Sequence, residues 1–335
     1  MILVTGGTGL VGSHLLYKLI KNNEQVKAIY RREKKLEIVK RVFSYYTDDF
    51  QTLFNKIEWI KADLLNIPLL TDAFINVTHV YHCAAFVSFE PDKYHLLRQT
   101  NIEGTANIVN LCIANNIKKL CYVSSIATIG TTLNNIEITE DTHWDPEADN
   151  SVYAITKYGA EMEVWRGTQE GIDAVIVNPG VIIGAGIWNY GSGGLFKRVY
   201  KGLDYFTNGS VGYVDVEDVI DTMITLMKSS IINERFILVS ENSTYKHFLQ
   251  SIAKALGVKQ PHKEAKKSVL GIGWRLDWLL YKLKGKRRSL TKQLAASLVS
   301  KYSYSNSKIK QYLNVEFKPI EKSIVEVSKQ FLKDL

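Results

Sequence analysis

The chain has 335 residues, of which 46% are hydrophobic and 23% are charged, which is typical of a globular protein with two domains or one large domain and an appended lobe. Its three cysteines form no CxxC pair, so the sequence indicates neither a disulfide framework nor a zinc site, and we expect no metal. No signal peptide precedes the first predicted strand and no apolar stretch is long enough to span a bilayer, so we expect a cytoplasmic protein.

The charge is unevenly distributed along the chain. The net charge is +8, but residues 254–310 contain fifteen Lys or Arg and two acids, and therefore carry a local net charge of +13. A solvated basic surface explains this segment, and so does a face for an anionic partner, either a phosphate-bearing substrate or a membrane surface. We favour the solvated surface.

The chain opens with an apolar run at residues 2–4, a glycine-rich turn at residues 5–12 (Thr-Gly-Gly-Thr-Gly-Leu-Val-Gly) and a predicted helix over residues 13–21. Gly6 and Gly9 allow a tight turn close to a pyrophosphate, and Gly12 allows the helix to pack on the strand. The positive end of the helix would then face the phosphate. The spacing is GxxGxxG, which by itself is a weak signal.

Strands and helices alternate through the first half. Near-continuous apolar runs predict strands over residues 25–30, 57–61, 79–83, 119–123 and 174–177, and helical spacing predicts a helix over residues 101–115. This alternation is typical of a parallel sheet covered on both faces. Residues 184–212 are rich in glycine and aromatic side chains, which favours a loop-rich substrate lobe.

Three side chains could carry the chemistry. Tyr153 and Lys157 share one helix face, and a nearby ammonium group favours the phenolate and lowers the pKa of a tyrosine. Ser125 ends a predicted strand, where its hydroxyl can hold a carbonyl oxygen beside Tyr153. Together they suit proton transfer next to a hydride carrier.

In these motifs the chain resembles the extended short-chain dehydrogenase/reductase family. The motifs that carry the resemblance are residues 5–12, Asp63 with Leu64, residues 82–85, residues 101–105, residues 122–126, Tyr153 with Lys157 and Glu161, residues 178–180, and residues 214–219. The resemblance implies an α/β fold with a Rossmann-type, doubly wound parallel sheet and a smaller, mainly helical C-terminal lobe. It implies a dinucleotide-binding domain over 1–178, to which 213–240 returns, and a substrate-binding lobe over 179–212 and 241–335.

The resemblance also implies the roles of particular residues. Ser125, Tyr153 and Lys157 would be catalytic, with Ser124 as the neighbouring candidate to Ser125. Asn101 matches a structural or proton-relay position, of which we favour the structural one. The implied cofactor contacts are Gly6, Thr8, Gly9, Leu10, Val11, Gly12, Arg31, Arg32, Asp63, Leu64, Ala84, Ala85, Tyr153, Lys157 and Pro179.

The end of the second strand bears on the choice of cofactor. NAD-specific members of such families usually place an acid there, but this chain has Tyr30 followed by Arg31 and Arg32. An arginine can grip a ribose phosphate and stack on adenine, so NADP is favoured. Glu33 lies close enough in the sequence for NAD to stay an alternative cofactor. Alternatively, Arg31 and Arg32 are solvated side chains that bind no cofactor.

Within the family, the chain resembles the branch of dihydroflavonol reductase, cinnamoyl-CoA reductase and 3β-hydroxysteroid dehydrogenase. Residues 177–184, 304–308 and 317–319 carry this placement. It implies a pocket for a bulky, partly apolar substrate, with contacts from Phe86, Ser125, Asn178, Trp188 and Phe196. For the aromatic residues, ordinary core packing is an equal alternative.

We therefore expect an NADP-dependent oxidoreductase that interconverts a carbonyl and an alcohol, with Tyr153 as the proton donor. The alternatives are a nucleotide-sugar epimerase with resident NAD and a non-enzymatic dinucleotide-binding protein. In the nucleotide-sugar dehydratases of the family that the chain resembles, an Asp-Glu pair directly follows the catalytic hydroxyl. No such pair follows Ser125, so a dehydratase is disfavoured.

The expected partner is a small-molecule substrate, without nucleic acid; a homodimer stays open. Residues 269–283 combine leucines and tryptophans with charges. This pattern favours a helix packed on the substrate lobe over an interfacial amphipathic helix, so we do not expect membrane contact.

Overall fold

The computed structural model describes residues 1–132, 137–285, 288 and 290–335. Its centre is a seven-stranded sheet with the order β10-β6-β5-β4-β1-β2-β3, in which every neighbouring pair is parallel. The predicted doubly wound α/β fold is confirmed. The strands are β1 (Ile2–Thr5), β2 (Val26–Tyr30), β3 (Glu58–Lys61), β4 (His79–His82), β5 (Lys119–Val123), β6 (Ala174–Pro179) and β10 (Glu234–Leu238).

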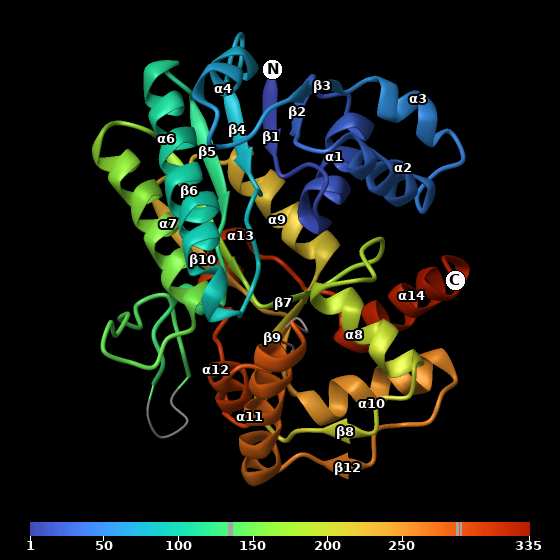
Figure 1. The fold of residues 1–335 in the computed structure, drawn as a ribbon. Helices are drawn as coiled ribbons and strands as arrows, with labels where there is room; N and C mark the ends of the chain where they lie inside the picture. The colour runs from blue at the N-terminus through green and yellow to red at the C-terminus, as the bar shows by residue number, and fades with distance from the viewer. Residues whose placement is uncertain (133–136, 286–287, 289) are drawn as a thin grey trace.

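Helices cover both faces of this sheet (Figure 1). Consecutive strand residues point to opposite faces, so Leu3 belongs to one buried cluster and Val4 to the other. This explains why the strands read as continuous apolar runs. One face carries α1 (Leu10–Lys21), α2 (Leu36–Ser44), α3 (Phe50–Asn55) and α9 (Val216–Lys228), and the other carries α4 (Ile67–Ala73), α6 (Gly104–Ala114) and α7 (Val152–Gln169).

The strand order reverses between β1 and β4. From β1 the chain builds outward through β2 and β3, then returns to place β4 on the other side of β1. The two strands are held at their carboxyl ends by Thr5 Oγ1, which lies 2.6 Å from His82 Nδ1. Burial lowers the pKa of His82 to about 3, so this imidazole is neutral. In open α/β sheets such a switch point is where ligands bind.

The second half builds a smaller lobe. A three-stranded sheet with the order β11-β9-β7 packs against helices around a core of its own. Its elements are β7 (Val181–Ile183), β9 (Ser210–Asp215), β11 (Glu241–Thr244), α8 (Gly191–Tyr200), α10 (Tyr245–Leu256) and α14 (Ile320–Lys333). Because β10 returns to the main sheet and β9 stays in the small one, we retain the division into 1–178 with 213–240, and 179–212 with 241–335, as a proposal.

The expectation of a loop-rich segment over residues 184–212 is wrong in part, because α8 and the short strand β8 (Tyr205–Phe206) lie there. The glycines serve packing as well as turning. A Cβ on Gly193 would lie 1.9 Å from the carbonyl oxygen of Ile187, so glycine allows this helix to approach the preceding loop.

The basic segment contains α11 (Lys267–Lys284), which is preceded by β12 (Lys263–Glu264) and followed by α12 (Lys292–Ser297) and α13 (Ser307–Leu313). One face of α11 packs as expected, with Leu270 buried and Trp274 against the same small cluster. Its other face is exposed. Lys286 and Arg287 of the basic segment lie outside the described residues. Within the described part of the chain, no helix has the length and apolar character needed to cross a membrane.

The contact between the glycine turn and β4 predicts an unequal effect of two substitutions. Gly6 has φ +69°, and a Cβ there would lie 2.6 Å from the backbone nitrogen of Ala84. Gly171 has φ +96° but no atom within 4 Å of such a Cβ. Both Ala variants carry backbone strain, and only Gly6→Ala also collides with backbone.

We therefore expect Gly6→Ala to lower the midpoint of thermal unfolding by roughly 5 °C more than Gly171→Ala, as followed by circular dichroism. Equal losses for the two variants would contradict a close contact between the glycine turn and the end of β4.

Candidate active site

The glycine turn (residues 5–12) lies at the switch point. Gly6 contacts the backbone of Ala84 just beyond β4, and a Cβ on Gly12 would lie 2.2 Å from the carbonyl oxygen of Gly6. The backbone of the turn is therefore bare where the ends of β1 and β4 meet, and α1 begins at Leu10 with Gly9 as its N-cap. A bare backbone at a helix N-terminus is suited to a pyrophosphate, so the residues present fit a dinucleotide.

The other predicted cofactor contacts lie along the same edge of the sheet. Thr8 and Leu10 are half-buried, whereas Val11 is buried in the first turn of α1. Ala84 and Ala85 follow β4, with Ala85 exposed, and Pro179 ends β6. Asp63 and Leu64 follow β3.

The two arginines follow directly after β2 and are exposed. The Nη1 atom of Arg31 lies 3.4 Å from Oδ2 of Asp63, and both side chains are about half exposed. Such a surface ion pair contributes little to stability, so it constrains Arg31 weakly. Arg31 is therefore available to an anion at this edge of the sheet.

Ser125 and Tyr153 lie next to each other in the structure. Ser125 follows β5, and its hydroxyl accepts a hydrogen bond from the backbone of Ala127 at 3.1 Å. A hydrogen bond with Ser125 lowers the pKa of Tyr153, but burial has the larger effect, so the pKa lies above its ordinary value. Tyr153 is therefore protonated at neutral pH. Ser124, the neighbouring candidate, instead donates to Glu161 at 2.5 Å.

Lys157 does not bond Tyr153 in this structure. Its Nζ donates to the hydroxyl of Tyr122 at 2.6 Å and to the carbonyl oxygen of Val123 at 2.9 Å. Burial lowers the pKa of Lys157 to about 7, and Glu161 opposes this shift. The expected lowering of the Tyr153 pKa by this ammonium is not present in the free chain, where the pKa is raised.

Glu161 is a functional candidate that the sequence prediction left out of the site. It is fully buried on α7 and accepts hydrogen bonds from Ser124, Thr128 and Asn178. Arg235 on β10 pairs with its other oxygen at 3.0 Å. The spacing of Tyr153, Lys157 and Glu161, four residues apart on one helix face, was a signal that could have found it. Tyr122 had no comparable signal, because it sits inside an apolar strand.

The predicted substrate contacts separate into two groups. Phe86 is half-buried near the site, and its backbone exchanges two hydrogen bonds with the side chain of Asn101, at 2.8 and 3.0 Å. Asn101 thus has the structural contacts we favoured. Asn178 is buried and donates to Glu161.

Trp188 and Phe196 do not lie among these residues. They pack with Phe331 in the core of the smaller lobe, and the indole of Trp188 donates to Asp334 at 2.7 Å. Core packing, the alternative interpretation, describes both side chains, because they are buried among apolar neighbours. Phe89 lies closer to the predicted catalytic residues, with its ring centroid 5.5 Å from that of Tyr153.

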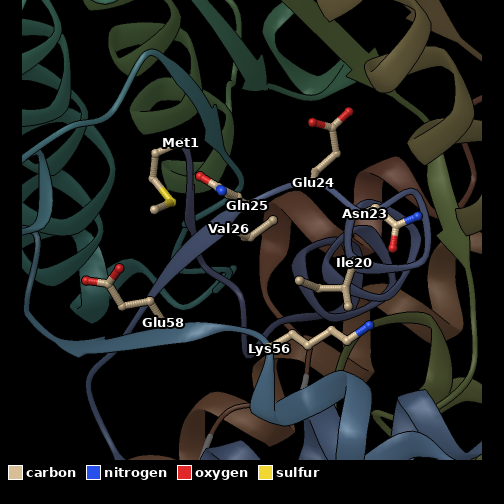
Figure 2. A pocket seen from close by; sticks show the side chains of 8 residues that line it. All are labelled: Met1, Ile20, Asn23, Glu24, Gln25, Val26, Lys56 and Glu58. Carbon is tan, nitrogen blue, oxygen red and sulfur yellow. The ribbon is translucent and has the colours of Figure 1, made fainter.

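A hollow of about 310 Å³ lies at the opposite end of the strands (Figure 2). It is lined by Met1, Gln25 and Val26 at the amino ends of β1 and β2, together with Asn23, Glu24, Lys56, Glu58 and Ile20. It contains none of the predicted site residues, and it lies away from the edge where the strand order reverses. It is therefore not the candidate site.

Comparison with known proteins agrees with this geometry. The model of the NAD-dependent epimerase/dehydratase family matches residues 2–237. Sterol demethylase protein B of Methylococcus capsulatus is 26% identical over 268 residues, covering 77% of this chain and 75% of that protein. A putative dihydroflavonol 4-reductase of Synechocystis sp. is 28% identical, covering 77% of this chain and 73% of the relative.

Two further comparisons extend this result. A UDP-glucose 4-epimerase of Vibrio cholerae is 28% identical over 256 residues, covering 72% of this chain and 70% of that protein. The crystal structure of gox2253 superposes with a TM-score of 0.82 at 23% identity and covers 100% of this chain and 98% of its own. Reductases and an epimerase therefore both occur among the named relatives.

The Glu161 network predicts a large loss of stability in one variant. Glu161→Gln replaces one carboxylate oxygen with an NH₂ group, which cannot accept the hydrogen bonds that the oxygen accepts. It also removes the negative charge that pairs with Arg235. Breaking a buried ion pair costs about 3–5 kcal/mol, and we expect a loss of this size in the free energy of unfolding.

The matched control is Glu163→Gln, two residues away on α7, whose carboxylate forms a more exposed pair with Arg166 at 2.9 Å. It should change the free energy of unfolding by no more than about 1 kcal/mol. Urea unfolding measures both variants, and similar losses would argue against the buried network.

The lowered pKa of Lys157 predicts a dependence of stability on pH. Between about pH 7 and pH 10.5 the unfolded chain holds a proton on Lys157 that the folded chain releases, so the cost of burying this lysine falls as the pH rises. Below pH 7 the cost is fully present.

We expect the unfolding midpoint of the wild type to rise relative to that of Lys157→Met between pH 6.5 and pH 9.5, measured without cofactor. A difference that stays constant over this range would show that Lys157 remains charged in the folded chain.

Proposed function

Because the chain belongs to the NAD-dependent epimerase/dehydratase family of extended short-chain dehydrogenases/reductases, we propose that it is an NADP-dependent oxidoreductase that interconverts a carbonyl and an alcohol on a bulky, partly apolar small molecule. One observation carries the proposal: Tyr153, whose pKa is raised by burial, lies beside Ser125 at the edge of the sheet where the glycine turn lies. The reductases among its relatives support it.

The proposed cofactor contacts follow the edge of the sheet. The pyrophosphate would lie over Gly6, Gly9 and Gly12, with Thr8, Leu10 and Val11 in the same turn and Ala84 and Ala85 beside it. Asp63 and Leu64 would lie near the adenine, and Pro179 near the nicotinamide. When bound, the dinucleotide supplies or accepts the hydride at its nicotinamide ring.

Arg31 and Arg32 support NADP over NAD. They occupy the end of β2, where an acid would bind the ribose hydroxyls of NAD, and their exposed guanidinium groups can bind a phosphate. The weak pair between Arg31 and Asp63 leaves the arginine free to reorient.

Tyr153 is the proposed acid. As the carbonyl carbon gains the hydride, its oxygen takes the proton from the hydroxyl of Tyr153, so the O–H bond of the tyrosine breaks and an alcohol forms. The raised pKa keeps that proton in place until substrate is present. Ser125 would donate to the same carbonyl oxygen and orient it, and Lys157 would hold the nicotinamide ribose and stabilise the tyrosinate that results.

The surroundings of Tyr153 support an apolar substrate. The ring of Phe89 packs edge-on against that of Tyr153, Phe86 is fixed nearby by Asn101, and Val87 is exposed between them. An aromatic or alicyclic carbonyl compound would bury these side chains.

A nucleotide-sugar epimerase is the second candidate, because a UDP-glucose 4-epimerase is among the relatives at 28% identity. An epimerase would retain NAD through purification and act without added nucleotide. Absorbance of the purified protein near the nicotinamide band, before and after addition of substrate, separates the two activities.

The cofactor proposal predicts a selective loss in Arg31→Ala. The wild type should bind NADP⁺ more tightly than NAD⁺, and the variant should bind NADP⁺ about tenfold more weakly because a charge-assisted phosphate contact is lost. Binding of NAD⁺ should be nearly unchanged.

Calorimetric titration of both cofactors measures this effect. Lys34→Ala, which removes another exposed cation from the same loop, is the matched control and should leave the preference intact. Equal affinities of the wild type for both cofactors would contradict the proposal.

The proposed acid predicts that Tyr153→Phe loses activity and retains cofactor. With NADPH and a panel of aromatic aldehydes and ketones, turnover should fall by at least about 100-fold, because the ring remains and the proton is gone. The dissociation constant for NADP⁺ should stay within about twofold.

Tyr158→Phe, five residues further along α7 and stacked on Trp144, is the control and should keep its turnover. If Tyr153→Phe reduced the panel as fast as the control, another group would be the acid.

A further inference from the structure

The exposed face of α11 carries an unbroken apolar row. Val269, Ile272, Leu276, Leu279 and Leu283 follow one another at alternating spacings of three and four residues, so they form one stripe along the helix. All five are 43–73% exposed. At a rise of 1.5 Å per residue the stripe is about 21 Å long. We call these five residues the α11 stripe.

The rest of α11 shows that this exposure is specific to one face. Leu270 and Trp274 pack against α12, and Asp277 pairs with Arg288 and accepts from the backbone of Leu290 at 3.2 Å. Asp277, the only acid of α11, and the buried Leu270 therefore both lie on the packed side of the helix. The α11 stripe lies on the other side, where its side chains are exposed.

The charges beside the α11 stripe are positive. At 100° per residue, Arg275 and Lys282 lie along one edge of the stripe and Lys284 along the other, whereas Lys267 and Asp277 lie on the packed side. Arg275 and Lys282 lie over the rings of Trp274 and Trp278, at 4.5 and 5.3 Å from the ring centroids. An apolar stripe with cations along both edges is the pattern of a helix that lies in a membrane interface.

Because one face of α11 is exposed, we propose, contrary to the expectation from the sequence, that the α11 stripe docks on the surface of a bilayer that contains anionic lipid. The five apolar side chains would enter the boundary between headgroups and acyl chains, and the flanking cations would contact the lipid phosphates. A second copy of the chain is a poorer occupant, because two such faces would bring the three flanking cations of each copy together.

The position of α11 connects this surface to the proposed active site. Figure 1 shows α11 at the end of the molecule opposite the amino terminus. The hydroxyl of Tyr281 lies 3.5 Å from Asp92, in the segment that also holds Phe89 against Tyr153. That segment exposes Val87 and Leu96 as well. Because Tyr281 lies on the packed side of α11, this contact joins the helix to the segment beside Tyr153 and leaves the α11 stripe free to dock.

The test is flotation of the full chain with vesicles, without substrate or cofactor. Wild-type protein should float with vesicles of 70% phosphatidylcholine and 30% phosphatidylglycerol and should not float with pure phosphatidylcholine. Raising the salt concentration should weaken this binding, because it screens the cations. Failure of the wild type to float with the anionic vesicles would overturn the proposal.

Two variants assign the binding to α11. The double variant Leu276→Ser, Leu279→Ser should weaken partitioning into vesicles at least about tenfold, because it removes two leucines that would be buried in the bilayer interface. Lys282→Gln with Lys284→Gln should weaken it about threefold or more and reduce its salt dependence. The control is Ile75→Ser, which removes a side chain as exposed as Leu276, at 55%, but far from α11.

Unfolding midpoints of the variants should match the wild type, because the substituted side chains are exposed. If the leucine variant floats as well as Ile75→Ser, the proposal is wrong. If instead the wild type is a dimer by sedimentation, does not float, and becomes a monomer in the leucine variant, a second copy covers the stripe and the membrane proposal is likewise overturned.

Discussion

The backbone contact between Gly6 and Ala84 is the constraint on which the site depends. A Cβ at Gly6 would clash with the backbone of Ala84 just beyond β4, and a Cβ at Gly12 would clash with the carbonyl oxygen of Gly6. Three consecutive elements, β1, the glycine turn and α1, therefore close against β4 only with glycine at these positions. The buried hydrogen bonds of His82, to Thr5 at 2.6 Å and to Thr105 at 2.9 Å, hold the same ends together from behind.

A second, polar arrangement lies behind Tyr153. Glu161 collects donors from the end of β5, from β6 and from β10, so it fixes the position of α7 relative to three strands. Because Tyr153 and Lys157 lie on the same face of α7, this carboxylate sets their distance from the sheet. Lys157 rests on Tyr122 in the free chain, and a ribose hydroxyl would offer it a new partner. Binding of the dinucleotide is then also a change of partner for a buried amine whose pKa burial lowers to about 7.

Much of the first half could be predicted from the sequence, because local signals and the fold agree there. Apolar runs located six of the seven strands of the main sheet, and the spacing of Tyr153 and Lys157 placed both on one helix face. Contacts between distant segments were not predictable in the same way. Glu161 meets Arg235, and Lys157 meets Tyr122, only once the sheet has formed.

The second half was harder for a different reason. The glycines over residues 184–212 favoured loops, yet Gly193 lies in α8. Glycine is required there because the carbonyl oxygen of Ile187 leaves no space for a Cβ. Trp188 and Phe196 are aromatic residues of the kind that line a pocket, but in the structure they pack in a core. The residue type alone does not distinguish the two locations. For α11, the sequence showed apolar and basic residues together, but only the fold shows which face is covered.

A structure determined with NADP⁺ bound tests the central claim most directly. The account predicts the pyrophosphate against the backbone of Gly6, Gly9 and Gly12, the ribose phosphate at Arg31, and Lys157 turned from Tyr122 to the nicotinamide ribose beside Tyr153. A dinucleotide bound elsewhere on the chain, or bound at the switch point with its nicotinamide ring away from Tyr153, would contradict it.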